Sequence, residues 1–301
     1  MKPAGLTAAL SLSVVCLWAG VGAAAPLKIA ASAFPVYDFS RQVSGGRDAV
    51  SLIIPPGADS HIFEPSPSDR KKLAEADLFV YISDYMEPWA GRLALRPGVS
   101  LQAGKKASCI KVAQHKHHGH GHASGMCDPH IWLDAGNAEL MVSAIEVRLA
   151  EKDPFNATSY KSNSAAYRKR LQDMDARFKA GLASCRVKTL IHAGHAAFAY
   201  LAARYGLSFV SASGVTGDSE PAPSDMMALV REIKRTGAKY IFSEQRVNQR
   251  FASALESETG AQILQLHHIG SVSRQEAASS DYISLMEDNF AALQKGLECR
   301  H

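Results

Sequence analysis

The sequence has few cysteines and lacks the short motifs of the best-known metal, nucleotide and nucleophile sites. No two of its five cysteines are spaced as Cys-x-x-Cys, and His-Glu-x-x-His does not occur. These absences argue against a zinc finger and against the common zinc proteases. No glycine-rich loop leads from a predicted strand into a helix, and no Ser-His-Asp elbow is present, so a nucleotide site and a serine hydrolase are not expected either.

An excess of charge of one sign is also missing. The chain has 33 Lys and Arg against 29 Asp and Glu, a net charge of +4 over 301 residues. No basic face and no interleaving of basic and aromatic residues stands out, so nucleic acid is not expected as a partner. Beyond the N-terminus, no apolar run approaches the roughly 20 residues that a membrane span needs. We therefore expect the mature protein to be soluble.

Residues 1–24 have the order of a secretory signal peptide. Lys2 supplies a positive charge, an apolar run follows from Leu6 to Trp18, and small residues come next. This order predicts export, with cleavage near Ala23 or Ala24. The apolar run is too short to be a good membrane anchor.

Strands alternate with helices in two series, which predicts an α/β fold. The strands of the first series are expected at 27–33, 49–54 and 78–82, and those of the second at 187–191, 207–211, 239–242 and 263–266. Between the two series, residues 154–182 are polar and helix-favouring, and Asp153 before Pro154 is typical of a helix start.

This pattern predicts two lobes with mostly parallel sheets, joined by one long rigid helix, with a site in the cleft between them. The domains are then a signal peptide (1–24), an N-terminal lobe (25–152), a linking helix (153–183) and a C-terminal lobe (184–301). A helix of that length would span roughly 40 Å at 1.5 Å per residue, enough to extend along both lobes.

The five cysteines divide between the signal peptide and the mature chain. Cys16 would be the acylated residue of a lipoprotein, but Val15 stands where a small residue is needed, so lipid anchoring is not predicted. Four cysteines remain in the mature chain. An even number of cysteines in an exported protein predicts disulfides, and four cysteines allow three pairings. We favour the pairings that keep each bridge within one predicted lobe, namely Cys109 with Cys127 and Cys185 with Cys299.

Histidine is the most unusual feature of the composition. Five of the twelve histidines lie in the segment 113–126, at His115, His117, His118, His120 and His122. Such a tract cannot build a core, so we expect a surface loop that binds metal as an accessory to another site. A polar insertion with incidental metal affinity is the alternative interpretation.

Other histidines follow predicted strands. His61 comes after the second strand, His195 after 187–191, and His267 and His268 after 263–266, while His130 lies in the segment DPHIWLD. In parallel sheets, ligands bind at the carboxyl ends of the strands, where loops converge. Two histidines from each lobe, facing a shared cleft, would form a four-nitrogen metal site.

With these residues identified, the chain resembles the ZnuA/TroA-like solute-binding proteins of bacterial zinc ABC transporters (cluster A-I, or cluster 9). The similarity extends over essentially the whole mature chain. It is carried by PPGADSHIFEPSPSD (55–69), DPHIWLD (128–134), HAAFAYLAARYGL (195–207), SEPAPSDMMALVREIK (219–234) and IFSEQ (241–245).

The resemblance implies a set of metal ligands. His61, His130 and His195 match ligand positions of the family, and His195 stands where manganese members often have glutamate. The fourth position falls on His267, with His268 or a water molecule as alternatives.

Nitrogen ligands without carboxylates suit tetrahedral Zn²⁺, whereas manganese prefers oxygen. Copper binds histidine more tightly than zinc does, so the sequence does not fix the metal preference in vitro. Carboxylates or backbone carbonyls should hold the outer ring nitrogens. The candidate carboxylates are Asp59, Glu64, Asp134 and Glu244.

The resemblance further implies a monomeric periplasmic protein that captures Zn²⁺ and delivers it to the inner-membrane permease of an ABC importer, with periplasmic zinc chaperones as further partners. A zinc buffer or chaperone, or a metal-dependent adhesin without an importer, is the alternative. A zinc hydrolase would need an open coordination position, which a fourth histidine closes, so no enzyme activity is expected. A long helix along both lobes should restrict their rotation, so we expect loops to move rather than a wide hinge.

Overall fold

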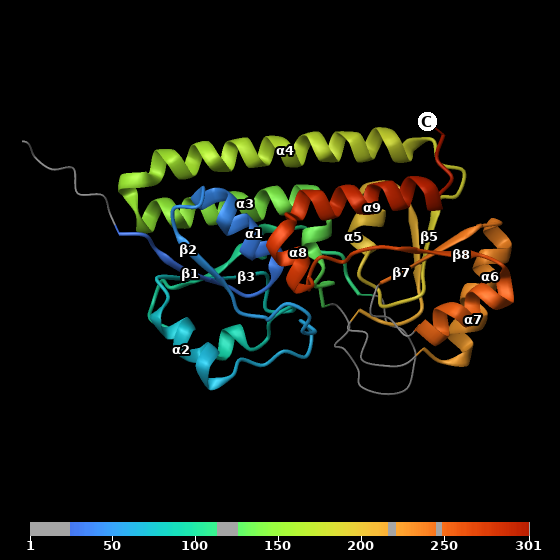
Figure 1. Cartoon of the computed structure of the whole chain (residues 1–301), viewed down its shortest axis with the longest axis horizontal. Coiled ribbons are helices and arrows are strands. Elements are labelled where there is room, and N and C mark those ends of the chain that lie inside the picture. Colours follow the sequence, from blue (N-terminus) through green and yellow to red (C-terminus); the bar gives the residue numbers. More distant parts are fainter. Residues whose placement is uncertain (1–24, 113–125, 216–220, 245–248, 301) are drawn as a thin grey trace, which may run out of the picture.

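The protein consists of two α/β lobes lying side by side beneath long helices (Figure 1). The computed structural model describes residues 25–112, 126–215, 221–244 and 249–300. The predicted signal peptide and the histidine tract therefore lie outside the described residues. The N-terminal lobe contains β1 (Lys28–Ala31), β2 (Ala49–Leu52), β3 (Leu78–Tyr81) and β4 (Ser100–Gln102). The C-terminal lobe contains β5 (Thr189–His192), β6 (Ser208–Ser211), β7 (Tyr240–Ser243) and β8 (Gln262–Gln265).

The two sheets have the same topology. Their strand orders are β2-β1-β3-β4 and β6-β5-β7-β8, and every paired strand is parallel to its neighbour. The predicted fold class, two parallel α/β lobes with a long helix, is confirmed. Because loops converge at the carboxyl ends of parallel strands, each sheet directs the loops that follow its strands toward one edge.

Helices cover the sheets and join the lobes. The N-terminal lobe has α1 (Phe34–Ser44), α2 (Pro67–Glu75) and α3 (Ala135–Lys152), and α4 (Ala157–Ala183) leads to the second lobe. The C-terminal lobe has α5 (Ala199–Arg204), α6 (Pro223–Thr236), α7 (Gln249–Thr259), α8 (Arg274–Ser279) and α9 (Tyr282–Gly296). Among these described helices, none is both long and apolar enough to cross a bilayer.

The helix α4 extends along both lobes, with α3 beside its first half and α9 beside its second (Figure 1). Its buried stripe repeats at helical spacing and consists of Tyr160, Tyr167, Leu171, Met174, Phe178 and Leu182. The hydroxyl of Tyr167 donates to Asp38 on α1 at 3.0 Å, and the same carboxylate accepts from the backbone N–H of Tyr282 on α9 at 3.1 Å. One buried carboxylate therefore connects α1, α4 and α9.

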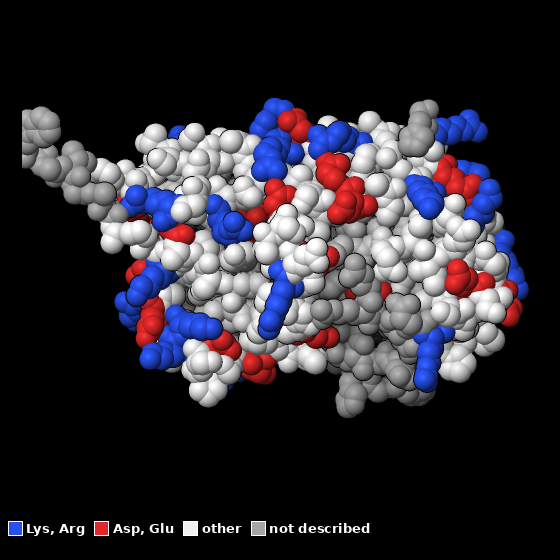
Figure 2. Space-filling view, viewed as in Figure 1, with Lys and Arg blue, Asp and Glu red and all other residues white. Residues whose placement is uncertain are grey.

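Charged residues of both signs are interspersed on the face shown in Figure 2, and neither sign forms a continuous patch there. Ion pairs also connect the two long helices. Arg170 of α4 pairs with Asp281, which caps α9, and Arg177 of α4 pairs with Glu287 in α9. Exposed pairs of this kind contribute little stability individually, about 0–1 kcal/mol.

The main departure from the sequence-based prediction is α3, an 18-residue helix that we did not predict. Asp134 begins it, because its carboxylate accepts a hydrogen bond from the backbone N–H of Asn137 at 2.8 Å. Near the end of the chain, α8 and α9 are separate helices, because Asp281 caps the start of α9 with its carboxylate, which accepts from the backbone N–H of Ser284.

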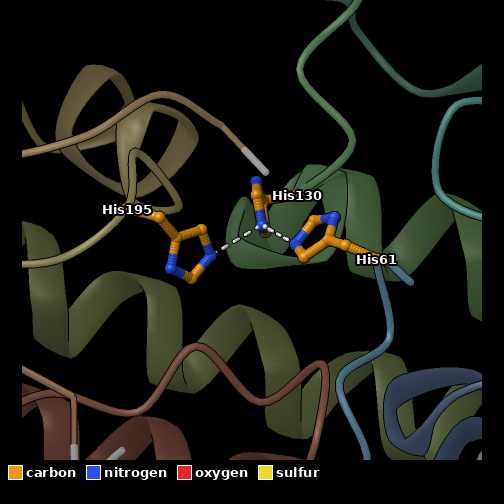
Figure 3. A group of neighbouring side chains, drawn as sticks. All are labelled: His61, His130 and His195. Carbon is orange, nitrogen blue, oxygen red and sulfur yellow. Dashed lines mark hydrogen bonds between the residues drawn. The ribbon is translucent and has the colours of Figure 1, made fainter. Parts of the chain in front are cut away.

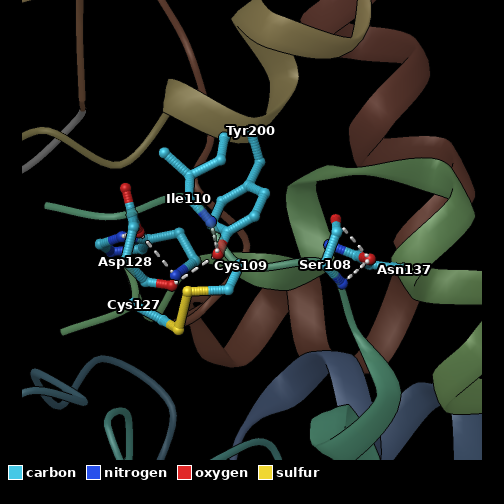
Figure 4. Close-up of a disulfide and its surroundings, with 8 residues drawn as sticks. Ser108, Cys109, Ile110, Cys127, Asp128, Asn137 and Tyr200 are labelled. Carbon is cyan, nitrogen blue, oxygen red and sulfur yellow. Dashed lines mark hydrogen bonds and ion pairs between the residues drawn. A yellow bond between two sulfur atoms is a disulfide. The ribbon is translucent and has the colours of Figure 1, made fainter. Parts of the chain in front are cut away.

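The structure contains both predicted disulfides, Cys109–Cys127 and Cys185–Cys299. The first joins two short extended segments of the N-terminal lobe (Figure 4). The same segments pair as an antiparallel bridge between Lys111 and Cys127. The second fastens the segment after α4 to the segment after α9. It therefore links the first and last segments of the C-terminal lobe covalently, next to the end of the long helix α4.

Candidate metal centre

Three histidines from separate loops meet at the junction of the lobes (Figure 3). His61 lies in the loop between β2 and α2, His130 just before the short 3-10 helix Ile131–Leu133, and His195 in the loop between β5 and α5. Nε2 of His130 lies 3.2 Å from Nε2 of His61 and 3.2 Å from Nε2 of His195. Ligands of a tetrahedral zinc ion, at about 2.0–2.1 Å from the metal, are about 3.3 Å apart. The two distances from Nε2 of His130 therefore fit one zinc ion, and the ligand atoms of all three histidines lie within 4.8 Å of one another.

Asp128 orients His130. Its carboxylate Oδ1 lies 2.8 Å from Nδ1 of His130 and also accepts from the backbone N–H of His130 at 2.9 Å. The ring proton is therefore placed on Nδ1, and the lone pair of Nε2 faces the other two histidines. Burial, and then the neighbouring His195 and His61, hold the pKa of His130 well below its ordinary value. The ring is thus neutral, the form that binds a metal.

Glu244, directly after β7, orients His195. Its Oε1 lies 2.8 Å from Nδ1 of His195, which leaves Nε2 of that ring directed at His130. Burial alone would lower the pKa of His195, but the contact with Glu244 outweighs burial, and the pKa is raised. His192 adds a second contact, with Nε2 at 3.6 Å from the same oxygen, and burial lowers the pKa of His192 to about 4.

Neither His267 nor His268 joins the cluster of three in the described part of the chain. Nδ1 of His267 accepts from the backbone N–H of Ile269 at 2.8 Å, and its Nε2 lies 3.3 Å from Glu276. Both ring nitrogens of His267 are therefore engaged, although the sequence led us to expect this residue as the fourth ligand.

His268 lies nearer the cluster, with its ring centroid 5.4 Å from that of His195. Its Nδ1 accepts from the backbone N–H of Gly270 at 3.2 Å, and its Nε2 lies 3.7 Å from Glu244. Because Nδ1 acts as an acceptor, the ring proton lies on Nε2 and faces the carboxylate. In this arrangement His268 supports Glu244 rather than offering a lone pair to the cluster.

The four carboxylates considered from the sequence have different partners. Glu244 contacts the ring of His195, as described above. Asp59 accepts from the backbone N–H of His61 at 2.8 Å, and Asp134 caps α3 and pairs with Arg204. Glu64 pairs with Arg92 at the surface. Sequence reasoning missed Asp128, although a carboxylate two residues before a ligand histidine is within reach of its ring.

We expect Glu244→Ala to weaken zinc binding about 10- to 100-fold, the usual effect of removing the partner of a ligand's outer nitrogen. Without Glu244, His195 loses the contact that fixes its proton on Nδ1. Competition titration with a zinc chelator would measure the change. Glu276→Ala is the matched control, because Glu276 pairs with His267 outside the cluster. Equal losses in the two variants would contradict the assigned role of Glu244.

Zinc binding should strengthen as the pH rises through the pKa of His195, which Glu244 raises above its ordinary value of 6.5. Below that pKa the proton on His195 competes with the metal, so apparent affinity falls by about tenfold per pH unit for each proton displaced. Calorimetry in two buffers of different ionisation enthalpy would count the protons released. Release that does not increase as the pH is lowered through this range would contradict the prediction.

Hydrogen bonds between the lobes surround the cluster. The indole N–H of Trp132 donates to the backbone carbonyl of His268 at 2.7 Å, and the hydroxyl of Tyr282 donates to the carbonyl of Trp132 at 2.5 Å. Nearer His61, the hydroxyl of Ser271 donates to the carbonyl of Ala58 at 2.7 Å. The loops that carry the histidines are therefore tied directly to the opposite lobe.

Two parallel α/β lobes, a helix along both and a histidine cluster at their junction define the class of two-lobed metal-binding proteins. The chain belongs to the ZnuA family, since the family model described as zinc-uptake complex component A, periplasmic, matches residues 29–296.

Known relatives agree with this assignment. The zinc-binding protein AdcA of Streptococcus pyogenes is 32% identical over 289 residues, which cover 89% of this chain and 55% of the relative. The chain thus spans about half the length of this curated relative. The high-affinity zinc uptake system protein ZnuA of Bacillus subtilis is 32% identical over 280 residues, covering 90% of this chain and 88% of the relative.

Among solved structures, the Zn(II)-bound ZnuA-like domain of Streptococcus pneumoniae AdcA superposes with a TM-score of 0.76 at 31% identity, covering 91% of this chain and 99% of the domain. The laminin-binding protein Lmb of Streptococcus agalactiae, described as having adhesin and metal-transporting activity, gives a TM-score of 0.79 at 29% identity, covering 90% and 99%.

Proposed function

We propose that this protein captures Zn²⁺ outside the cytoplasm and delivers it to the membrane permease of an ABC importer. The observation that carries the proposal is the cluster of His61, His130 and His195, whose facing nitrogens have the spacing of zinc ligands. Relatives named for zinc binding and zinc uptake support the same metal and the same process. Export by residues 1–24, a periplasmic location and a monomeric state belong to this proposal.

We further propose that Nε2 of each of these three histidines binds the ion and that a water molecule completes the tetrahedron. Two observations favour water over His267 and His268. His267 has both ring nitrogens engaged, and Nε2 of His268 directs its proton at Glu244. X-ray absorption of the zinc-loaded protein tests this set, since three nitrogens and one oxygen are expected. Four nitrogens would contradict it.

The first test of capture is a competitive zinc titration of the metal-free mature protein beside a version that lacks residues 115–122. One tight site that survives the deletion is expected, because the cluster lies outside the tract. Loss of tight binding together with the tract would contradict the assignment of the main site and favour a zinc buffer.

Zinc should also stabilise the fold. A ligand that binds only the folded state raises the free energy of unfolding in proportion to the logarithm of the ratio of free ligand concentration to Kd. At a free zinc concentration of 1,000 times Kd the expected gain in the free energy of unfolding is about 4 kcal/mol. Urea unfolding with and without zinc measures it. A His130→Ala variant, which should show little gain, is the control.

Delivery requires an experiment of its own, since a buffer would bind zinc equally well. Cells that lack the gene should regain zinc uptake with the unaltered protein and fail to do so with His130→Ala. Uptake that does not depend on the protein would contradict delivery and leave the buffer or chaperone as the better proposal.

A metal-dependent adhesin is the second candidate, and the likeness to Lmb favours it. A laminin-binding assay with zinc-loaded protein would test it. An enzyme is not proposed, although water in the fourth position would leave zinc open to a substrate. A hydrolase also needs a general base, and the carboxylates of Asp128 and Glu244 are engaged with the rings of His130 and His195.

A further inference from the structure

The hydroxyl of Tyr200 connects the two lobes beside the candidate site. Tyr200 lies in α5 and is only 2% exposed. Its hydroxyl accepts a hydrogen bond from the backbone N–H of Ile110 at 3.0 Å and donates one to the backbone carbonyl of Asp128 at 3.1 Å (Figure 4). Both partners belong to the N-terminal lobe, whereas α5 belongs to the C-terminal lobe. The hydroxyl is therefore satisfied entirely across the junction of the lobes.

The two partners of this hydroxyl lie on either side of a disulfide. Ile110 follows Cys109, and Asp128 follows Cys127, so the bridge between the cysteines fixes the separation of the two segments. Backbone hydrogen bonds reinforce the pair, including one from the N–H of Asp128 to the carbonyl of Ile110 at 2.8 Å. Tyr200 thus contacts a rigid unit rather than two independent strands.

This unit leads directly to one ligand, and α5 leads to another. Asp128 holds Nδ1 of His130 through its carboxylate, while its own carbonyl is held by Tyr200. On the other side, Tyr200 is five residues beyond His195, in the helix that follows the His195 loop. A continuous chain of contacts therefore crosses the junction of the lobes beside the cluster. It leads from His130 to Asp128, then to Tyr200 and the segment that contains His195.

We propose that Tyr200 is a positioning residue for zinc binding, an inference that rests on the proposed function. Its hydroxyl fixes the disulfide-linked unit against α5 and so maintains the 3.2 Å separation between Nε2 of His130 and Nε2 of His195. Without the hydroxyl, a half-buried N–H and a buried carbonyl lose their partner, and the buried carbonyl in particular is costly to leave unpaired. The unit then shifts to find other partners, and His130 shifts with it.

The test compares Tyr200→Phe with Tyr160→Phe in the full mature chain. Tyr160 is a matched control, because its buried hydroxyl also bridges two segments and lies 3.0 Å from a carboxylate oxygen of Asp48 and 3.0 Å from one of Asp153. Its contacts lie between α4 and the N-terminal lobe and involve none of the cluster histidines or their partners. Both variants should lose stability, but only Tyr200→Phe should lose zinc affinity.

For Tyr200→Phe we expect zinc affinity to fall about tenfold or more, mainly through faster zinc release, by analogy with other residues that support ligands. Tyr160→Phe should leave affinity unchanged. Unchanged affinity in Tyr200→Phe, or equal losses in both variants, would overturn the inference. An unaltered protein without a tight zinc site would instead contradict the proposed function itself, and the inference with it.

A thermodynamic cycle tests the route of the effect. In an Asp128→Ala background the carboxylate that holds His130 is already absent, so Tyr200→Phe should reduce affinity much less than in the unaltered chain. Full additivity of the two changes would contradict the route through Asp128.

A measurement on the unaltered protein covers the case in which Tyr200→Phe does not fold. Because coupling between two sites is reciprocal, zinc should tighten the contact at Tyr200. Hydrogen exchange of the Ile110 amide, which donates to Tyr200, should then slow by more than that of Val112, which donates to the carbonyl of Met126. Equal slowing at the two amides would overturn the inference.

Discussion

His130→Ala is expected to lower the affinity for zinc by two to three orders of magnitude. His130 lies within 3.2 Å of both other cluster histidines, so its removal leaves the two remaining nitrogens without their common neighbour. Structural zinc sites bind with about 10–16 kcal/mol shared among four ligands, so one ligand accounts for about 2.5–4 kcal/mol. Competition titration against chelators of graded affinity would measure the loss.

His267→Ala is the control for this prediction. The ring of His267 contacts Ile269 and Glu276 and lies outside the cluster, so little change in zinc affinity is expected. A loss as large as that of His130→Ala would contradict the geometry and return His267 to the ligand set that the sequence suggested.

Removing the disulfide Cys185–Cys299, by replacing both cysteines with alanine, is expected to lower the free energy of unfolding by about 3–5 kcal/mol. The two cysteines are 114 residues apart, and the bridge restricts the unfolded chain over that whole length. It also fastens the end of α4 to the end of α9. Urea unfolding of the oxidised protein and of the double variant would measure the difference.

The other disulfide supplies the comparison. Cys109 and Cys127 are 18 residues apart, so the chain-entropy argument gives their bridge about 1.6 kcal/mol less stabilisation than the longer one. Replacing these two cysteines should therefore destabilise the fold less, while affecting zinc binding more, because Asp128 adjoins the bridge. The opposite ranking of the two stabilities would contradict the loop-length argument.

The sequence was sufficient for most of the fold. Short apolar runs such as 78–82 are typical of buried parallel strands, and their alternation with helices favours parallel α/β lobes. The helix α3 was missed although its signals are present, since Asp134 caps it and its buried residues recur at helical spacing, at Ala138, Met141, Val142, Ile145 and Leu149. The sequence therefore contains enough local information to predict α3.

The fourth ligand could not be predicted in the same way, because no local sequence pattern distinguishes His267 from His268 or from water. His267 and His268 are adjacent in an irregular segment after β8, where neither the strand nor the helix period applies. Ile269 adopts a positive φ of 64°, a conformation that side chains with a branched β-carbon rarely adopt. This turn, together with the hydrogen bond from Trp132 to the carbonyl of His268, decides which ring faces the cluster.

The hydrogen bonds that tie the lobes together around the cluster limit what the proposed permease could detect. If Trp132, Tyr200 and Tyr282 keep their contacts when zinc leaves, loaded and empty protein have nearly the same outline. The proposed permease would then have to distinguish them by a local surface difference near the cluster. Ile62, 69% exposed and next to His61, stands where such a difference would be displayed. The zinc-bound and zinc-free states would then differ in the conformation of one loop and not in the overall shape of the molecule.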